Sequence, residues 1–125
     1  EYALAIVSAA QDAGIDLSKI YIDPIVLPVN VSQQQCVELL ESLREFKLLS
    51  DPPPKTVVGL SNVSQGTKFR PLINRTYLVM AIANGLEAAI VDPFDKELMD
   101  AVITAELLLN KHIYCDSFLD AYRKK

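Results

Sequence analysis

The apolar residues of this 125-residue chain are grouped in segments whose spacing alternates between that of buried strands and that of helices. Nearly continuous apolar runs occupy residues 19–27, 56–61 and 86–91. Such runs are typical of parallel strands that are covered on both faces. They begin about 30 to 36 residues apart, which is the spacing of strand–helix–strand units. The pattern therefore predicts three parallel strands.

Helical spacing is found at residues 2–13, 32–46, 72–84, 98–109 and 117–125. Ser32 and Gln35 have the spacing of a capping box, in which a serine side chain binds the backbone of the first helical turn. Asp95 is expected to cap the helix that follows the third strand. The segment 72–84 is apolar nearly all round, so we expect neighbouring elements to cover it deeply.

This alternation of strands and helices indicates an α/β fold with a parallel sheet. Two architectures fit: a small doubly wound sheet, or part of an eight-stranded (β/α) barrel, which needs about 250 residues to close. Three strands cannot close a barrel, and alone they would leave both edges of the sheet open. We therefore favour part of a barrel that further residues or another chain complete.

Charge and composition narrow the classes of partner. The net charge of −4 disfavours a nucleic-acid partner, because phosphate contacts need a basic surface. No apolar run reaches the roughly 18 residues of a membrane-spanning helix, and no leader suggests secretion. Cys36 and Cys115 are far apart without metal-binding spacing, so we expect reduced, partly buried thiols in a cytoplasmic protein.

The candidate chemistry follows the second predicted strand. Six hydrogen-bonding residues lie in the run after it: Ser61, Asn62, Ser64, Gln65, Thr67 and Arg70. The carboxyl ends of parallel strands open onto the ligand-binding face of an α/β protein. Gly59 in the strand indicates a close approach of backbone or ligand. The same polar run is also compatible with an ordinary solvated turn.

Asp23 interrupts the first apolar run just before Pro24. It is either a turn aspartate or a carboxylate aimed at a ligand from the end of a strand. A carboxylate can accept two parallel N–H bonds from a 2-amino-pyrimidinone ring, and an asparagine can both donate and accept along a ring edge. A flat, polar heterocycle such as a pterin or purine is therefore the candidate ligand.

Other polar residues have simpler interpretations. His112 is the only histidine, and we expect it to be structural or exposed, without a metal site. An acidic set is formed by Asp92, Asp95, Glu97 and Asp100. Turn and cap chemistry is the expected role of this set, and an adventitious divalent cation is the alternative. The chain contains no phosphate-binding or nucleophile motif of the common types.

Four longer runs carry a family resemblance: YIDPIVLPVN at 21–30, KTVVGLSNVSQG at 55–66, RPLINRTYLVMA at 70–81 and LLLNKHIYCDSF at 107–118. They resemble the methyltetrahydrofolate:corrinoid/iron-sulfur protein methyltransferases, a branch of the pterin-binding barrels related to dihydropteroate synthase. The resemblance covers essentially the whole chain. It implies that residues 1–125 are a partial pterin-binding domain, the carboxyl-terminal half of a TIM (β/α)8 barrel.

The resemblance also implies an activity and a set of roles. The reaction would move a methyl group between N5 of methyltetrahydrofolate and the cobalt of a corrinoid, a cobalamin-type group carried by a partner protein. Asp23 matches the aspartate that pairs with the pterin ring, and Asn62 matches the catalytic asparagine near N5. The other matching positions line the same pocket: Gly59, Ser61, Gln65, Arg70 and Ile90.

Two alternatives remain open at this stage. Relatives in demethylation systems run the transfer from methylcorrinoid to tetrahydrofolate, and Gly66, Lys68 and Phe69 make the loop less polar than is expected of the family. A non-catalytic half-barrel module for binding or assembly, including one that pairs with a copy of itself, is the other alternative. We expect a homodimer with a corrinoid protein as its partner, and little folate binding by the 125-residue chain alone.

Overall fold

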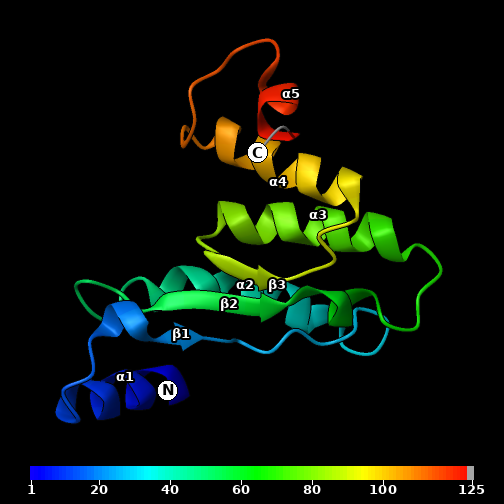
Figure 1. The fold of residues 1–125 in the computed structure, drawn as a ribbon. Helices are drawn as coiled ribbons and strands as arrows, with labels where there is room; N and C mark the ends of the chain where they lie inside the picture. The colour runs from blue at the N-terminus through cyan, green and yellow to red at the C-terminus, as the bar shows by residue number, and fades with distance from the viewer. Residues whose placement is uncertain (124–125) are drawn as a thin grey trace.

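The computed structural model describes residues 1–123, which form a curved α/β arrangement (Figure 1). Five helices are present: α1 (Tyr2–Asp12), α2 (Gln33–Phe46), α3 (Arg70–Ala83), α4 (Lys96–Leu108) and α5 (Phe118–Arg123). Three strands are β1 (Tyr21–Ile22), β2 (Lys55–Gly59) and β3 (Ala88–Ile90). Two 3₁₀ helices, η1 (Leu17–Lys19) and η2 (Leu60–Ser64), complete the described chain.

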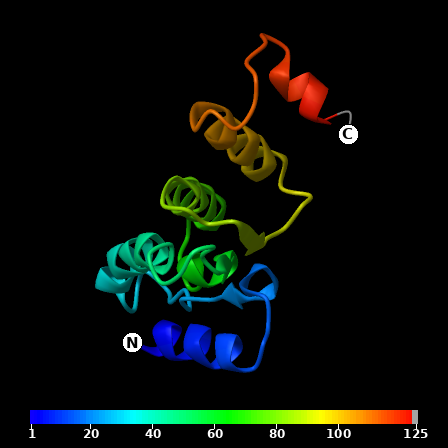
Figure 2. The ribbon, with the colours of Figure 1, turned by 90° about the vertical axis from the view of Figure 1, so that its left-hand side faces the viewer.

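The three strands are parallel, and their order in the sheet, β1-β2-β3, is their order in the chain. A doubly wound sheet reverses its direction of growth at a switch point, whereas a barrel adds each strand beside the previous one. Right-handed crossovers between strands in sequential order place the connecting helices on one side of the sheet. Figure 2 shows α2 and α3 on the same side of the strands. The predicted α/β fold is confirmed, and its winding is that of a barrel segment.

The strands are shorter than the apolar runs that predicted them. Regular pairing of β1 ends at Ile22, because Pro24 has no N–H to donate to a ladder and Asp23 turns the chain. The run that was predicted to extend to residue 61 changes at Leu60 into η2. Apolar composition predicted where the strands lie, but backbone pairing decides where they stop.

Side chains alternate between the two faces of β2. Thr56 and Val58 are buried beneath the helices, with 0% and 1% of their surface exposed, respectively. Lys55, Val57 and Gly59 lie on the opposite, partly exposed face. The helix side forms the main core, which includes the buried residues Leu39, Leu43, Val58, Tyr77, Leu78 and Ala81. A smaller cluster of Val7, Ala10, Leu17 and Ile22 joins α1 to β1.

Several local predictions are corrected. Ser32 precedes α2, but its side chain makes no capping hydrogen bond, so the capping box is wrong. The helix α3 is not covered all round, since Leu72 and Met80 are about half exposed. Cys115 is exposed, whereas Cys36 is partly buried and its burial raises the pKa of its thiol.

The predicted cap of α4 and the predicted helix at the end of the chain can both be compared with the structure. The Asp95 carboxylate accepts a 3.1 Å bond from the backbone N–H of Leu98, so the predicted cap of α4 is confirmed. The predicted terminal helix 117–125 is observed as Phe118–Arg123, and Lys124 and Lys125 lie outside the described residues. Among residues 1–123, no helix has the length and apolarity needed to cross a membrane.

Thr56 supplies the first testable prediction. Its buried hydroxyl donates to the Gly85 carbonyl at 3.1 Å and accepts from the Glu87 N–H at 3.2 Å, which joins β2 to the chain entering β3. Thr56→Val removes both bonds and leaves two partly buried backbone groups without this partner. We expect it to lower the free energy of unfolding by about 1–3 kcal/mol, as measured by urea denaturation.

Thr104→Val is the matched control. The Thr104 hydroxyl bonds only to the Asp100 carbonyl one turn back in α4. Because that carbonyl also accepts a helical backbone bond, we expect a loss below about 0.5 kcal/mol. Equal losses at the two positions would contradict the role assigned to Thr56.

Candidate functional site

The carboxyl ends of the three strands point to one edge of the structure, at the right of Figure 1. There β2 continues directly into η2, which carries the polar run identified in the sequence. Leu60 and Val63 are 2% and 1% exposed, respectively, and anchor η2 in the core. A 3₁₀ helix repeats every three residues, so Leu60 and Val63 share the buried face, and Ser61 and Asn62 between them are both exposed. Gln65, directly after η2, is exposed as well.

An open surface lies beside these side chains. Gly59 pairs in register with Ile90, and two residues earlier in each strand Val57 pairs with Ala88. These four residues share the face of the sheet away from α2 and α3. A Cβ added at Gly59 would meet nothing within 4 Å, so no protein backbone approaches it closely. Of the two explanations for this glycine, the close approach of backbone is not observed in the described residues, and the approach of a ligand stays a prediction.

Asp23 lies at the carboxyl end of β1 and is exposed. Its Oδ1 accepts a 2.8 Å bond from the backbone N–H of Ile25, so the turn role predicted for this aspartate is confirmed. Ile25 has φ +67°, a rare conformation for a β-branched residue. Backbone strain of this kind is concentrated at functional sites, and here it lies two residues from the candidate ligand carboxylate.

Arg70 contacts the protein itself at this edge. Its Nε donates to the Ser64 hydroxyl at 3.0 Å, and its Nη2 donates to the Ser61 carbonyl at 3.0 Å. Two of the five N–H donors of the guanidinium are therefore directed at the loop that carries Asn62. The sequence suggested a pocket-lining arginine, and the structure places it as a brace of η2.

Two residues near the site were not singled out as site residues from the sequence. Ser64 is 0% exposed, although it lies in a run of polar residues. Asn30 reaches across from the connection between β1 and α2, with its Nδ2 3.5 Å from the Gly66 carbonyl. The sequence did not predict that Asn30 lies near the site, because Gly66, the residue it contacts, is 36 positions away in the chain.

The structure thus distributes the predicted residues along one edge. Asp23 follows β1, Ile90 ends β3, and Arg70 begins α3. The central group is on β2 and the chain that follows it: Gly59, Ser61, Asn62 and Gln65. Together they make an open wall: an apolar sheet face with amide, hydroxyl and carboxylate groups at its rim. Such a wall can hold a flat ring on its face and bond the edge of that ring.

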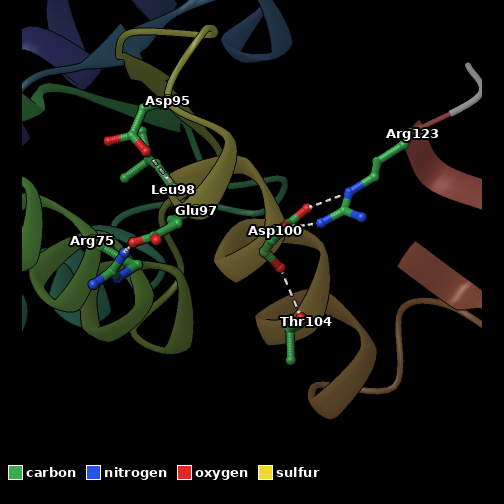
Figure 3. Close-up of polar contacts among 7 residues, drawn as sticks. All are labelled: Arg75, Asp95, Glu97, Leu98, Asp100, Thr104 and Arg123. Carbon is green, nitrogen blue, oxygen red and sulfur yellow. Dashed lines mark hydrogen bonds and ion pairs between the residues drawn. The ribbon is translucent and has the colours of Figure 1, made fainter. Parts of the chain in front are cut away.

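The acidic residues near β3 do not form a second site (Figure 3). Glu97 pairs with Arg75, Asp100 pairs with Arg123, and Asp92 accepts from the Phe94 N–H at 2.9 Å. No three His, Cys, Asp or Glu side chains within residues 1–123 are placed to hold a metal ion. The turn role of Asp92 and the cap role of Asp95 are confirmed, whereas the ion pairs of Glu97 and Asp100 were not predicted. Nothing within residues 1–123 supports the cation alternative. His112 is exposed, with its Nε2 2.7 Å from Glu106 Oε2.

Comparisons with known proteins agree with this geometry. Residues 1–92 match a family described as pterin binding enzyme, and the matched segment includes every predicted site residue. The chain is also similar to a methylcorrinoid:tetrahydrofolate methyltransferase of Eubacterium limosum, with 25% identity over 127 residues. The match covers 99% of this chain and 45% of that relative. The chain therefore spans about half the length of the curated relative.

Proposed function

The chain belongs to the family of pterin binding enzymes, and from that premise we propose that it is part of a methyltransferase acting between tetrahydrofolate and a corrinoid. The methyl group moves between N5 of the folate and the cobalt of a corrinoid carried by a partner protein. Similarity along nearly the whole chain to a methylcorrinoid:tetrahydrofolate methyltransferase supports this proposal. The proposal includes residues 1–125 as the carboxyl-terminal half of the barrel.

One observation carries the proposal: an exposed amide lies next to open space above the sheet. The amide is that of Asn62, just past the end of β2, and the space is at Gly59, the last residue of that strand. A pterin ring needs a flat surface under its face and polar groups along its edge. Gly59 and Ile90 supply the surface in adjacent strands. Asn62 supplies an amide one turn beyond it.

The remaining residues are assigned by their chemistry and position. Asp23 accepts two parallel N–H bonds from the 2-amino-pyrimidinone edge of the pterin and so fixes its orientation. Ser61 and Gln65, both exposed beside Asn62, bond other polar atoms of the folate. Arg70 has donors beyond the two that brace the loop, and we assign them to the same pocket.

Asn62 is assigned to the reacting nitrogen because N5 changes its bonding during transfer. When the methyl group leaves N5, that nitrogen takes back an electron pair and needs a proton or a strong hydrogen bond. When the methyl group arrives from methylcorrinoid, the N5 lone pair forms the new bond, cobalt keeps the electron pair of the broken bond, and the N5 proton passes to solvent water. An amide can accept from N5–H or donate to the lone pair, so it serves both directions.

For the direction of the reaction, we propose transfer from methylcorrinoid to tetrahydrofolate. The Eubacterium limosum relative is named for transfer in this direction, which supports this choice over the reverse. The exposed Phe69, in the loop after η2, suits an apolar contact with a large partner better than a polar one. The test is a comparison of initial rates in the two directions with the complete protein and its corrinoid partner.

Asn62→Ala tests the catalytic assignment. We expect kcat for methyl transfer to fall about 100-fold, because the amide acts mainly in the transition state, with little change in the Kd of tetrahydrofolate. Stopped-flow absorbance of the corrinoid measures the rate, and calorimetry measures the Kd. Gln34→Ala, which removes an exposed amide from α2, is the control and should leave both unchanged. A normal kcat in Asn62→Ala would remove Asn62 from the mechanism.

Asp23→Asn tests the recognition of the ring. Asparagine keeps the Oδ1 that holds the Ile25 N–H, so the turn persists, but it loses the charge and one of two acceptors. We expect the Kd of tetrahydrofolate to rise about 10- to 100-fold, as measured by calorimetry. Asp12→Asn on α1 is the control for a lost exposed charge. An unchanged Kd in Asp23→Asn would rule out the pterin contact.

A further inference from the structure

Ser64 is a fully buried hydroxyl two residues after the exposed amide of Asn62. Its Oγ donates to the Ser61 carbonyl at 3.2 Å and accepts from Arg70 Nε at 3.0 Å. Arg70 also donates from Nη2 to that same Ser61 carbonyl at 3.0 Å. Three hydrogen bonds therefore close a triangle among Ser64, Arg70 and the peptide that joins Ser61 to Asn62.

The backbone on either side of the triangle is tied down as well. The Ser64 carbonyl accepts from the Thr67 N–H at 3.0 Å and from the Thr67 hydroxyl at 2.7 Å. The Val63 carbonyl accepts a 2.9 Å bond from the Val29 N–H, which links η2 to the loop after β1. The triangle thus lies between two fixed segments, and the peptide preceding Asn62 is its exposed corner.

Two donors on the Ser61 carbonyl fix the plane of the Ser61–Asn62 peptide. That plane sets the direction in which the Cα–Cβ bond of Asn62 leaves the backbone. Resting on the proposed function, we propose that Ser64, acting together with Arg70, is a positioning residue that aims the Asn62 amide at the reacting nitrogen. A misplacement of about 1 Å in a catalytic group can lower a rate about 100-fold.

The position of Ser64 separates this role from direct contact with the substrate. A hydroxyl with 0% exposure cannot reach a ligand on the open wall. Its influence on the reaction must pass through the residues it holds, and the Ser61 carbonyl that it binds belongs to the peptide bond leading into Asn62. The effect of losing Ser64 on the rate should therefore depend on whether Asn62 is present.

The experiment is a double-mutant cycle in the complete protein. Ser64→Ala is made in the natural background and in the Asn62→Ala background, and kcat, folate Kd and the thermal unfolding midpoint are measured. We expect kcat to fall at least about 10-fold in the natural background and not to fall further in Asn62→Ala. The unfolding midpoint should decrease equally in both backgrounds, because the stability effect does not need Asn62.

Ser42→Ala is the matched control, since Ser42 also donates to a carbonyl, that of Glu38 on α2, away from the site. If Ser64→Ala does not fold, Arg70→Lys replaces it, because lysine keeps the charge but cannot serve Ser64 and Ser61 in the same fork. An equal fall of kcat in both backgrounds, or no fall in either, overturns the positioning role. A normal rate in Asn62→Ala removes Asn62 from the mechanism and overturns the positioning role with it, whereas the absence of methyl transfer by the unaltered complete protein and its corrinoid partner overturns the proposed function.

Discussion

The structure depends on the burial of one face of β2 against the helices. Thr56 and Val58 are enclosed on that side, and the hydroxyl of Thr56 holds the chain that enters β3. Because side chains alternate along a strand, enclosing these two residues turns Val57 and Gly59 to the other face. The open sheet face at Gly59, where we propose that the ligand binds, is thus the necessary counterpart of the core.

The polar rim follows from the same constraint. The core continues past the end of β2 through Leu60 and Val63, which hold η2 against the helices and leave Ser61 and Asn62 outside. Ser64 turns inward and is matched by Arg70. Within the polar run, Ser64 and Arg70 therefore support Ser61 and Asn62. This support lets the exposed side chain of Asn62 hold a defined direction without being buried.

The fold, and the position of the polar run at the end of β2, could be predicted from the sequence because they rest on local signals. Continuous apolar runs indicated parallel strands, and Asp95 before an apolar helical stripe indicated the start of α4. The sequence could not predict which loop residues support the loop and which face solvent. The burial of Ser64 and the bracing by Arg70 depend on contacts made after folding. For the same reason the exposed flank of α3 at Leu72 and Met80 was missed.

The central claim is that a pterin lies against the open face at Gly59, and Gly59→Val tests it most directly. The backbone there has φ −87°, which any residue adopts, and a Cβ would meet no protein atom within 4 Å. Calorimetric titration of tetrahydrofolate into the complete protein carrying Gly59→Val is the measurement. We predict a normal unfolding midpoint together with binding weakened at least about 5-fold, because a clash of methyl groups with the ligand costs about 1–3 kcal/mol. Unchanged affinity in a folded variant would contradict it.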